Sequence, residues 1–349
     1  MARNRIHLVA PAGSCSRFLD QLGVASAEPL VDLIRATVAE RFVVTADTAL
    51  IDAAEDEMTG GRRDDERRAA DLTGALADDD VIAVASLRGG SWFTRIIPRI
   101  DFAVLDRRAT RVAVTGFSEL TTLVNIVSAY EQGVGVYALG PTFLTYGLKR
   151  YAAQNGLTGG DRADAAGWMR ERLRTEFDRF FQNLTTMIDG RSSARTISAR
   201  RVRGDIPSDT TVRLVGGNLT VFSTLIGSRY ERCIDPTDRW LLLEDFNDSP
   251  PRLDRLLARL TLAGYFERCA GVLLGDFHDS ERDLTPAVVD MLDYHLPADR
   301  RVPVLVTADI GHRWPVVAAP LNVAVTLIEP DDDDRVKLSW EASATRTTN

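Results

Sequence analysis

The segment Arg111–Val127, RVAVTGFSELTTLVNIV, constrains the fold of this 349-residue chain more than any other stretch. The apolar run Val112–Val114 predicts a strand, Gly116–Ser118 predicts a tight turn, and the apolar spacing from Leu120 onward predicts a helix. Such a unit places Ser118 at the carboxyl end of a strand, beside the first amides of the helix. Leu120 breaks the G-x-S-x-G pattern, so two interpretations stay open: a nucleophilic serine, or a serine that only caps the helix.

Composition narrows the classes of function. The net charge is −8 and the isoelectric point is about 5.2, so nucleic acid is not expected as a partner. The chain shows no signal segment and no uninterrupted apolar run of ~18 residues, so we expect a cytoplasmic protein without a membrane span. Cys15, Cys233 and Cys269 form no C-x-x-C pair, which predicts structural thiols and no metal site.

The first 150 residues alternate between predicted strands and helices. Ile6–Ala10, Asp80–Leu87 and Gly135–Leu139 have strand composition, whereas Asp64–Leu76 is charged on one side and apolar on the other, which is typical of a surface helix. This alternation predicts a parallel sheet with helices on both faces, in an α/β domain that covers residues 1–150.

A glycine pair follows the second of these strands, in Arg88-Gly89-Gly90-Ser91. Paired glycines after a buried strand let the backbone approach a ligand closely, and their amides can hold an oxygen anion. A plain turn is the equal alternative at this point.

Residues 151–205 are expected to connect two domains. Asp164–Ile188 carries a helical apolar stripe between charged faces, which favours a core-facing helix over a partner-binding one. Asp189–Asp205 is rich in Arg, Ser and Gly and is predicted to be a solvated linker.

Residues 206–349 are predicted to form a β-rich domain. The strand Trp240–Leu243 ends in Glu244-Asp245, and successive side chains of a strand point to opposite faces, so at most one of these carboxylates should serve a given site. His312 lies in a loop after the strand Val302–Val306. Asp245 is expected to accept hydrogen bonds from backbone amides near the cap of the helix that begins near Ser249.

Ser118, Glu244 and His312 thus stand at predicted strand ends, in that chain order. A histidine can take the serine proton and return it to a leaving amine, while a carboxylate fixes its tautomer and stabilises the imidazolium. His7 is expected to be packed within a strand. His278 and His295 are expected in polar surface contexts.

Six segments in order resemble the serine LD-carboxypeptidases, the muramoyltetrapeptide carboxypeptidase family: RGGSWFTRIIPRID, GFSELTTL, GPTF, GGNLTVFSTLIGS, LLLEDFNDSPPRLDRLL and DIGHRWPVVAAPLN. The resemblance implies that Ser118 is the nucleophile, with Glu244 and His312 completing the triad, and that the amides of Gly90 and Glu119 form the oxyanion hole. It further implies a flavodoxin- or Rossmann-like N-terminal α/β domain, a C-terminal β-rich domain, a homodimer, and neither metal nor cofactor.

The chain departs from the family pattern at three places. Glu119 replaces the usual aspartate after the serine, Ser91-Trp92 replaces an aromatic-glycine pair, and Leu321-Asn322 replaces leucine-glycine. The first change keeps the backbone amide of residue 119 as a hydrogen-bond donor. The other two leave the substrate open, and we expect the substrate-binding residues to be Gly89, Trp92, Arg95 and Asn218.

Three functions are carried forward. The first is a serine carboxypeptidase that cleaves the LD peptide bond before the terminal D-alanine of murein tetrapeptides in cell-wall recycling. The second is an immunity-type peptidase that cleaves aminoacyl-nucleotides of the microcin C type, for which Trp92 or Trp168 would stack on a base. The third is a non-catalytic protein that binds a peptide between its domains.

Overall fold

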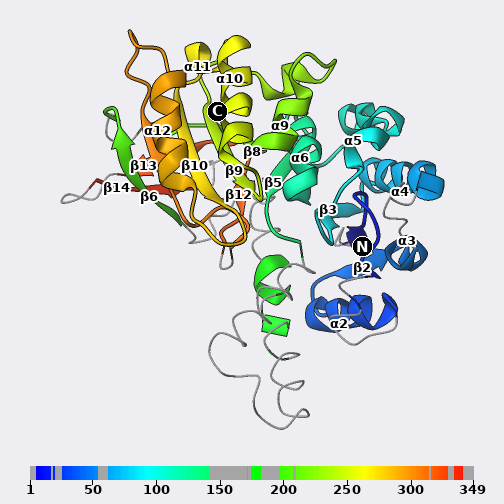
Figure 1. Cartoon of the computed structure of the whole chain (residues 1–349). Coiled ribbons are helices and arrows are strands. Elements are labelled where there is room, and N and C mark those ends of the chain that lie inside the picture. Colours follow the sequence, from blue (N-terminus) through cyan, green and yellow to red (C-terminus); the bar gives the residue numbers. More distant parts are fainter. Residues whose placement is uncertain are drawn as a thin grey trace, which may run out of the picture. The chain divides into compact units, whose positions relative to one another are not determined.

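The computed structural model in Figure 1 describes residues 5–16, 19, 26–53, 62–140, 171, 174–175, 177–181, 196–206, 210–313, 316–328 and 334–340. The chain divides into two compact units. Unit 1 comprises Met1–Leu123, Tyr130–Val134 and Leu139–Ile188, and unit 2 comprises Val124–Ala129, Gly135–Ala138 and Asp189–Asn349. The division predicted at residues 150 and 206 stays a prediction, but unit 2 also takes two short segments that precede residue 150.

The sheet of unit 1 has the strand order β5-β4-β3-β1-β2. Its strands are β1 (Arg5–Val9), β2 (Val43–Ala46), β3 (Val81–Ser86), β4 (Val112–Gly116) and the first residues of β5 (Gly133–Tyr137). β1 runs parallel to β2 and to β3, and β3 runs parallel to β4. In chain order this is 2-1-3-4-5, the flavodoxin-like order, so the predicted parallel α/β domain is confirmed.

The helices of unit 1 follow its strands. They are α2 (Glu28–Val38), α3 (Thr48–Asp52), α4 (Asp65–Ala77) and α5 (Phe93–Ile96), with 3-10 turns at Arg62–Asp64, Ile97–Arg99, Phe102–Arg107 and Ser118–Leu120. α6 (Thr121–Val127) begins in unit 1. The predicted surface helix is α4, which buries Ala69, Leu72 and Leu76. Glu66 and Arg67 are exposed, whereas Asp65 and Arg68 are buried.

The loops after β1 and β3 lie side by side. The sheet reverses its direction of construction between these two strands, and ligands of open α/β sheets gather at such a point. Leu87 N donates to Val9 O over 2.9 Å, and Ser91 N donates to Ala12 O over 3.1 Å. The glycine pair is therefore tied to the loop that follows β1.

The sheet of unit 2 is mixed, in the order β7-β13-β14-β6-β11-β10-β9-β8. The strands are β6 (Thr196–Arg203), β7 (Thr211–Val212), β8 (Leu214–Asn218), β9 (Trp240–Phe246), β10 (Gly271–His278), β11 (Val304–Val306), β13 (Val325–Ile328) and β14 (Arg335–Ser339). β8 to β11 are parallel, and the others pair antiparallel. A short strand, β12 (Ala319–Pro320), pairs with the last residues of β5.

Helices connect the parallel strands of unit 2. They are α9 (Leu219–Phe222), α10 (Pro250–Leu262), α11 (Tyr265–Arg268) and α12 (Thr285–His295), with 3-10 turns at Ser223–Leu225 and Glu231–Ile234. α12 packs on β10, and α10 packs on α12. The predicted β-rich C-terminal domain is confirmed, and it contains a parallel half with helical crossovers.

The predicted linker Asp189–Asp205 is wrong over its second half. Thr196–Arg203 is β6, an inner strand between β14 and β11. Ile197 and Ala199 are buried while Ser198 and Arg200 are exposed, which is the period of a half-buried strand. Among the described arginines of this segment, Arg200 is exposed whereas Arg201 and Arg203 are half-buried, so arginine content alone made the segment look solvated.

Part of the predicted helix Asp164–Ile188 lies outside the described residues. Residues 177–181 are helical and bury Phe177 and Phe181, in agreement with the apolar stripe. Among the described residues, no helix combines the length and apolar character that a membrane crossing requires.

Candidate active site

Ser118 begins the turn that joins β4 to α6. Its φ is +56°, a left-handed value that serine adopts rarely. Phe117 takes the N-cap position of the 3-10 turn, so Ser118 is the first residue inside the turn. A strained serine between a strand and a helix is the arrangement that exposes a nucleophile.

The glycine pair packs against this turn. A Cβ on Gly89 would lie 2.8 Å from Phe117 O and 3.0 Å from the Cβ of Ser118. Gly90 has φ of +135°, and a side chain there would run into Ala12 O and the Arg88 guanidinium. Gly89 is needed because the loop after β3 passes directly beside the serine turn, and Gly90 because its backbone has a positive φ and lies against Ala12 O.

The Glu119 side chain turns toward α5. Its Oε1 accepts a hydrogen bond of 3.3 Å from Thr94 N. Burial raises the pKa of this carboxyl, although hydrogen bonds from the amides of Thr94 and Phe93 act in the opposite direction. Glu119 thus links the serine turn to the start of α5 through its side chain.

Trp92 precedes α5 in a left-handed conformation. Its φ is +74°, a value that is strained for a bulky residue. The family that the sequence resembles carries glycine at this position. The indole is 38% exposed and the Arg95 guanidinium lies 5.1 Å from the ring centroid. Arg95 is itself held by Asp65, with Nη2 2.9 Å from Oδ1.

Glu244 and His312 meet in unit 2. Nδ1 of His312 lies 2.7 Å from Oε2 of Glu244, which is completely buried within β9. The hydroxyl of Tyr137, from the part of β5 that belongs to unit 2, donates to Oε1 of Glu244 over 2.6 Å. The three side chains therefore form a continuous buried hydrogen-bonded chain.

The charges around the hydrogen-bonded chain of Tyr137, Glu244 and His312 favour the imidazolium form of His312. Burial alone lowers the pKa of His312, but the charge and hydrogen bond of Glu244 outweigh it, and Asp245 and Asp276 add to the effect, so the pKa is raised. A base of this kind is stabilised once it has taken up a proton.

Asn218 joins the two adjacent carboxylates. Its Nδ2 lies 3.1 Å from Oδ1 of Asp245 and 3.4 Å from Oε1 of Glu244, while its Oδ1 accepts from Val221 N at the N-terminus of α9. Asp245 Oδ2 accepts from Thr220 N over 2.9 Å. The expectation that Asp245 serves the helix beginning near Ser249 is wrong, because Asp245 holds the first turn of α9.

Burial and the neighbouring Glu244 charge raise the pKa of Asp245 to about 6. Asn218 is 5% exposed, and its predicted contact with a substrate stays a prediction.

Two family models match this chain. The model of the LD-carboxypeptidase N-terminal domain matches residues 6–138, and that of the LD-carboxypeptidase C-terminal domain matches residues 211–327. The chain belongs to the LD-carboxypeptidase family. The two matches together cover most of the chain, and the predicted family resemblance is confirmed.

Relatives and solved structures agree. The probable murein peptide carboxypeptidase of Bacillus subtilis (strain 168) is 28% identical over 269 residues, 75% of this chain and 74% of that protein. Muramoyltetrapeptide carboxypeptidase from Oxalobacter formigenes superposes with a TM-score of 0.65 at 20% identity, over 97% and 99% of the two chains. The MccF-like protein from Bacillus anthracis str. Ames gives 0.68 at 17% identity, over 97% of each chain. At these identities the two structures show the fold alone.

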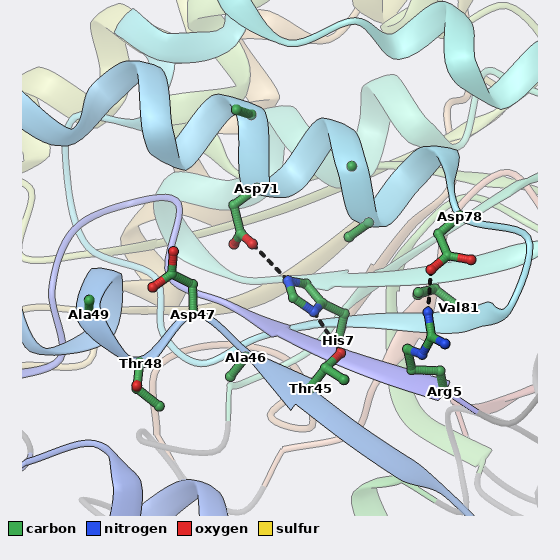
Figure 2. A pocket seen from close by; sticks show the side chains of 13 residues that line it. Arg5, His7, Thr45, Ala46, Asp47, Thr48, Ala49, Asp71, Asp78 and Val81 are labelled. Atoms are coloured by element: carbon green, nitrogen blue, oxygen red, sulfur yellow. Dashed lines mark hydrogen bonds and ion pairs between the residues drawn. The ribbon is translucent and has the colours of Figure 1, made fainter.

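The other histidines of this LD-carboxypeptidase differ from one another. His278 is buried, with Nδ1 2.6 Å from Oδ2 of Asp276, so its predicted surface context is wrong; β10 runs to His278 itself. His295 pairs with Asp254 over 2.8 Å. His7 lies within β1 as predicted, and Figure 2 shows its ring between Thr45 and Asp71. These three residues line an open pocket of about 600 Å³.

The departure at Leu321-Asn322 preserves backbone geometry. Asn322 has φ of +56°, a conformation that asparagine tolerates better than most residues, and its Nδ2 donates to Ser128 O over 2.8 Å. Asparagine can therefore replace glycine here without changing the turn.

Sequence reasoning missed Tyr137 and Phe246. Phe246 follows Glu244 by two positions on β9 and so shares its face, a signal that was present in the sequence. Tyr137 is 107 positions from Glu244, and no local pattern links them. Among the described residues, no group of three or more His, Cys, Asp or Glu side chains is arranged to hold a metal ion.

Proposed function

We propose that this LD-carboxypeptidase is a serine carboxypeptidase that hydrolyses the LD peptide bond before the terminal D-alanine of murein tetrapeptides. Ser118 is the nucleophile, His312 the general base and Glu244 its carboxylate partner. The observation that carries the proposal is the buried chain from Tyr137 through Glu244 to His312, with contacts of 2.6 and 2.7 Å. The name of the Bacillus subtilis relative supports the substrate class.

The reaction runs in two steps. Glu244 binds Nδ1, so Nε2 of His312 takes the Ser118 proton as Oγ attacks the carbonyl carbon of the scissile bond. The amides of Gly90 and Glu119 stabilise the oxyanion. His312 then returns the proton to the leaving amine of D-alanine, and water, deprotonated by His312, cleaves the acyl-enzyme to release the tripeptide and regenerate Ser118.

The direct test is incubation of the purified protein with UDP-MurNAc-tetrapeptide, with free D-alanine measured by mass spectrometry. We expect D-alanine and the matching tripeptide in equal amounts, and none from Ser118→Ala. Absence of release by the wild-type protein across neutral pH would overturn the murein assignment. Failure of a fluorophosphonate probe to label Ser118 would favour the non-catalytic binding protein instead.

One observation favours the immunity-type alternative. Trp92 keeps a strained, left-handed backbone and presents a partly exposed indole, a surface on which a nucleobase can stack. The solved MccF protein has been crystallised with aspartyl sulfamoyl adenosine. Cleavage of an aminoacyl-nucleotide, with a loss of activity in Trp92→Gly that spares murein peptides, would support this second activity. Trp168 lies outside the described residues.

The family resemblance also supports a homodimer. Light scattering after size-exclusion chromatography should give twice the 38.4 kDa chain mass. A monomer at micromolar concentration would contradict the dimer and leave the catalytic proposal standing.

A further inference from the structure

The ring of Phe246 stacks on the imidazole of His312. The two ring centroids are 5.1 Å apart and the planes differ by 19°. Phe246 also contacts His278, with centroids 4.8 Å apart and planes at 50°. It is the last residue of β9, two positions after Glu244, so one strand supplies both the carboxylate and the aromatic ring that touch His312.

Asp276 anchors the other side of this cluster. Its Oδ2 is 2.6 Å from Nδ1 of His278 and accepts from Nε of Arg313 over 2.9 Å. Its backbone N donates to Ile310 O over 2.7 Å. Gly311 has φ of +148°, and a Cβ there would collide with Asp276. β10 thus fixes both His278 and the turn that carries His312.

From this geometry we propose that Phe246, supported by His278, is a positioning residue for His312: its ring holds the imidazole plane and stabilises the imidazolium through a cation–π contact. The inference rests on the proposed role of His312 as general base. A stacked ring restricts rotation of the imidazole about its side-chain bond, and an aromatic face attracts a cation. The hydrogen bond from Nδ1 of His312 to Glu244 fixes only one ring nitrogen, so a contact on the ring face adds a constraint that Glu244 does not supply.

Other groups of unit 2 also act on His312. Glu244 on β9 bonds His312 directly, and the charges of Asp245 and Asp276 also raise the pKa of His312. The charge of His312 in turn acts on His278, as does that of Arg313. Arg313 is bound by Asp276 and lies 3.8 Å from Asp283. A substitution at Phe246 changes none of these charges, so its effect on His312 reports the ring alone.

The chain has four histidines, which makes the test direct. The imidazole signals of the full-length protein are followed by NMR against pH and assigned with single His→Gln variants. Phe246→Leu keeps apolar cover and removes the aromatic face, so the pKa of His312 should fall by about 0.5 unit. Phe246→Tyr keeps the ring and should leave that pKa in place. The signals of His7 and His295 are internal controls.

Kinetics supplies a second readout. Phe246→Leu should lower kcat about ten-fold with KM little changed, because a misoriented base affects the transition state more than substrate binding. The acid limb of its pH–rate profile should shift to lower pH together with the pKa of His312. In Phe246→Tyr, kcat and the acid limb should both be close to those of the wild-type protein. A merely structural ring would lower the melting temperature and leave the acid limb where it is.

The outcomes separate the two proposals. The NMR titration needs no substrate, so it judges the stack even where wild-type protein releases no D-alanine and the proposed function fails. An unchanged His312 titration in Phe246→Leu, or an equal fall in Phe246→Tyr, would overturn the positioning role while leaving the triad assignment intact.

Discussion

Two histidines of this protein each belong to a chain of hydroxyl, imidazole and carboxylate groups, but in a different order. At His7 the imidazole is the middle member: Nδ1 is 2.8 Å from the Thr45 hydroxyl and Nε2 is 2.9 Å from Asp71 (Figure 2). In the second chain the carboxylate of Glu244 is the middle member, between Tyr137 and His312.

The order of the members decides what each histidine can do. Both ring nitrogens of His7 are engaged by side chains of β2 and α4, so this imidazole cross-links three elements of unit 1. Glu244 instead uses one oxygen to receive Tyr137 and the other to fix Nδ1 of His312. A carboxylate held in this way imposes a tautomer on its histidine, which a base requires.

The largest expected effect is the loss of turnover when His312 is replaced. His312→Ala should lower turnover by about 10³-fold or more, as when a triad member is removed, without unfolding the protein. His7→Gln should keep turnover near the wild-type value because His7 is structural. D-alanine release and circular dichroism measure both variants, and near-native turnover in His312→Ala would end the assignment.

The two adjacent carboxylates come next. Glu244→Gln should keep the fold and lose on the order of 10²-fold or more in kcat, because an amide cannot stabilise the imidazolium. Asp245→Asn should lower kcat only slightly, because Asp245 accepts a hydrogen bond from the first turn of α9. Assay of both variants on one substrate separates the roles, and the reverse ranking would move the triad by one residue.

Tyr137→Phe tests the first member of the hydrogen-bonded chain from Tyr137 through Glu244 to His312. Removal of its hydroxyl deletes the 2.6 Å hydrogen bond to Glu244. A hydrogen bond to a charged group contributes about 1.5 kcal/mol, so kcat should fall roughly ten-fold with KM little changed. Steady-state kinetics at several pH values measures this effect; a wild-type kcat would show that Asn218 and the fold hold Glu244 without Tyr137.

The smallest effect is expected in the His7 chain. Thr45→Val replaces the hydroxyl of Thr45 by a methyl group of similar size and so removes its 2.8 Å contact with Nδ1 of His7. The free energy of unfolding should fall by about 1 kcal/mol with no change in kcat. Urea denaturation and the D-alanine assay measure the two quantities. A clear fall in kcat of a Thr45→Val protein that is still fully folded would give the pocket around His7 a role in the reaction.

Local patterns predicted much of the fold, including the local structure around Ser118 and the glycine pair. The apolar run and turn around Ser118 and the glycine pair are local features, and the structure has a strand, a left-handed serine and a close glycine loop there. β6 escaped prediction because its arginines masked an alternating strand. A local pattern reports which face is buried, and it fails where charged side chains cover an inner strand.

Pairings across the sequence were the harder part. Tyr137 reaches Glu244, and Asp245 reaches Thr220, only because β8 and β9 lie side by side and β5 contributes to unit 2. His278 was misplaced because β10 extends as far as His278, and polar neighbours in sequence suggested an exposed loop. Sequence order carries no direct measure of such distances.

The discontinuity of unit 2 has a consequence for synthesis on the ribosome. Tyr137 and its neighbours in β5 pair with β12, and Leu321 N bonds Gly135 O over 2.8 Å. These partners leave the ribosome more than 180 residues later, so at ordinary elongation rates the end of β5 waits on the order of tens of seconds for its neighbouring strand. During that interval the nascent chain carries an unpaired strand edge, the kind of surface that chaperones protect.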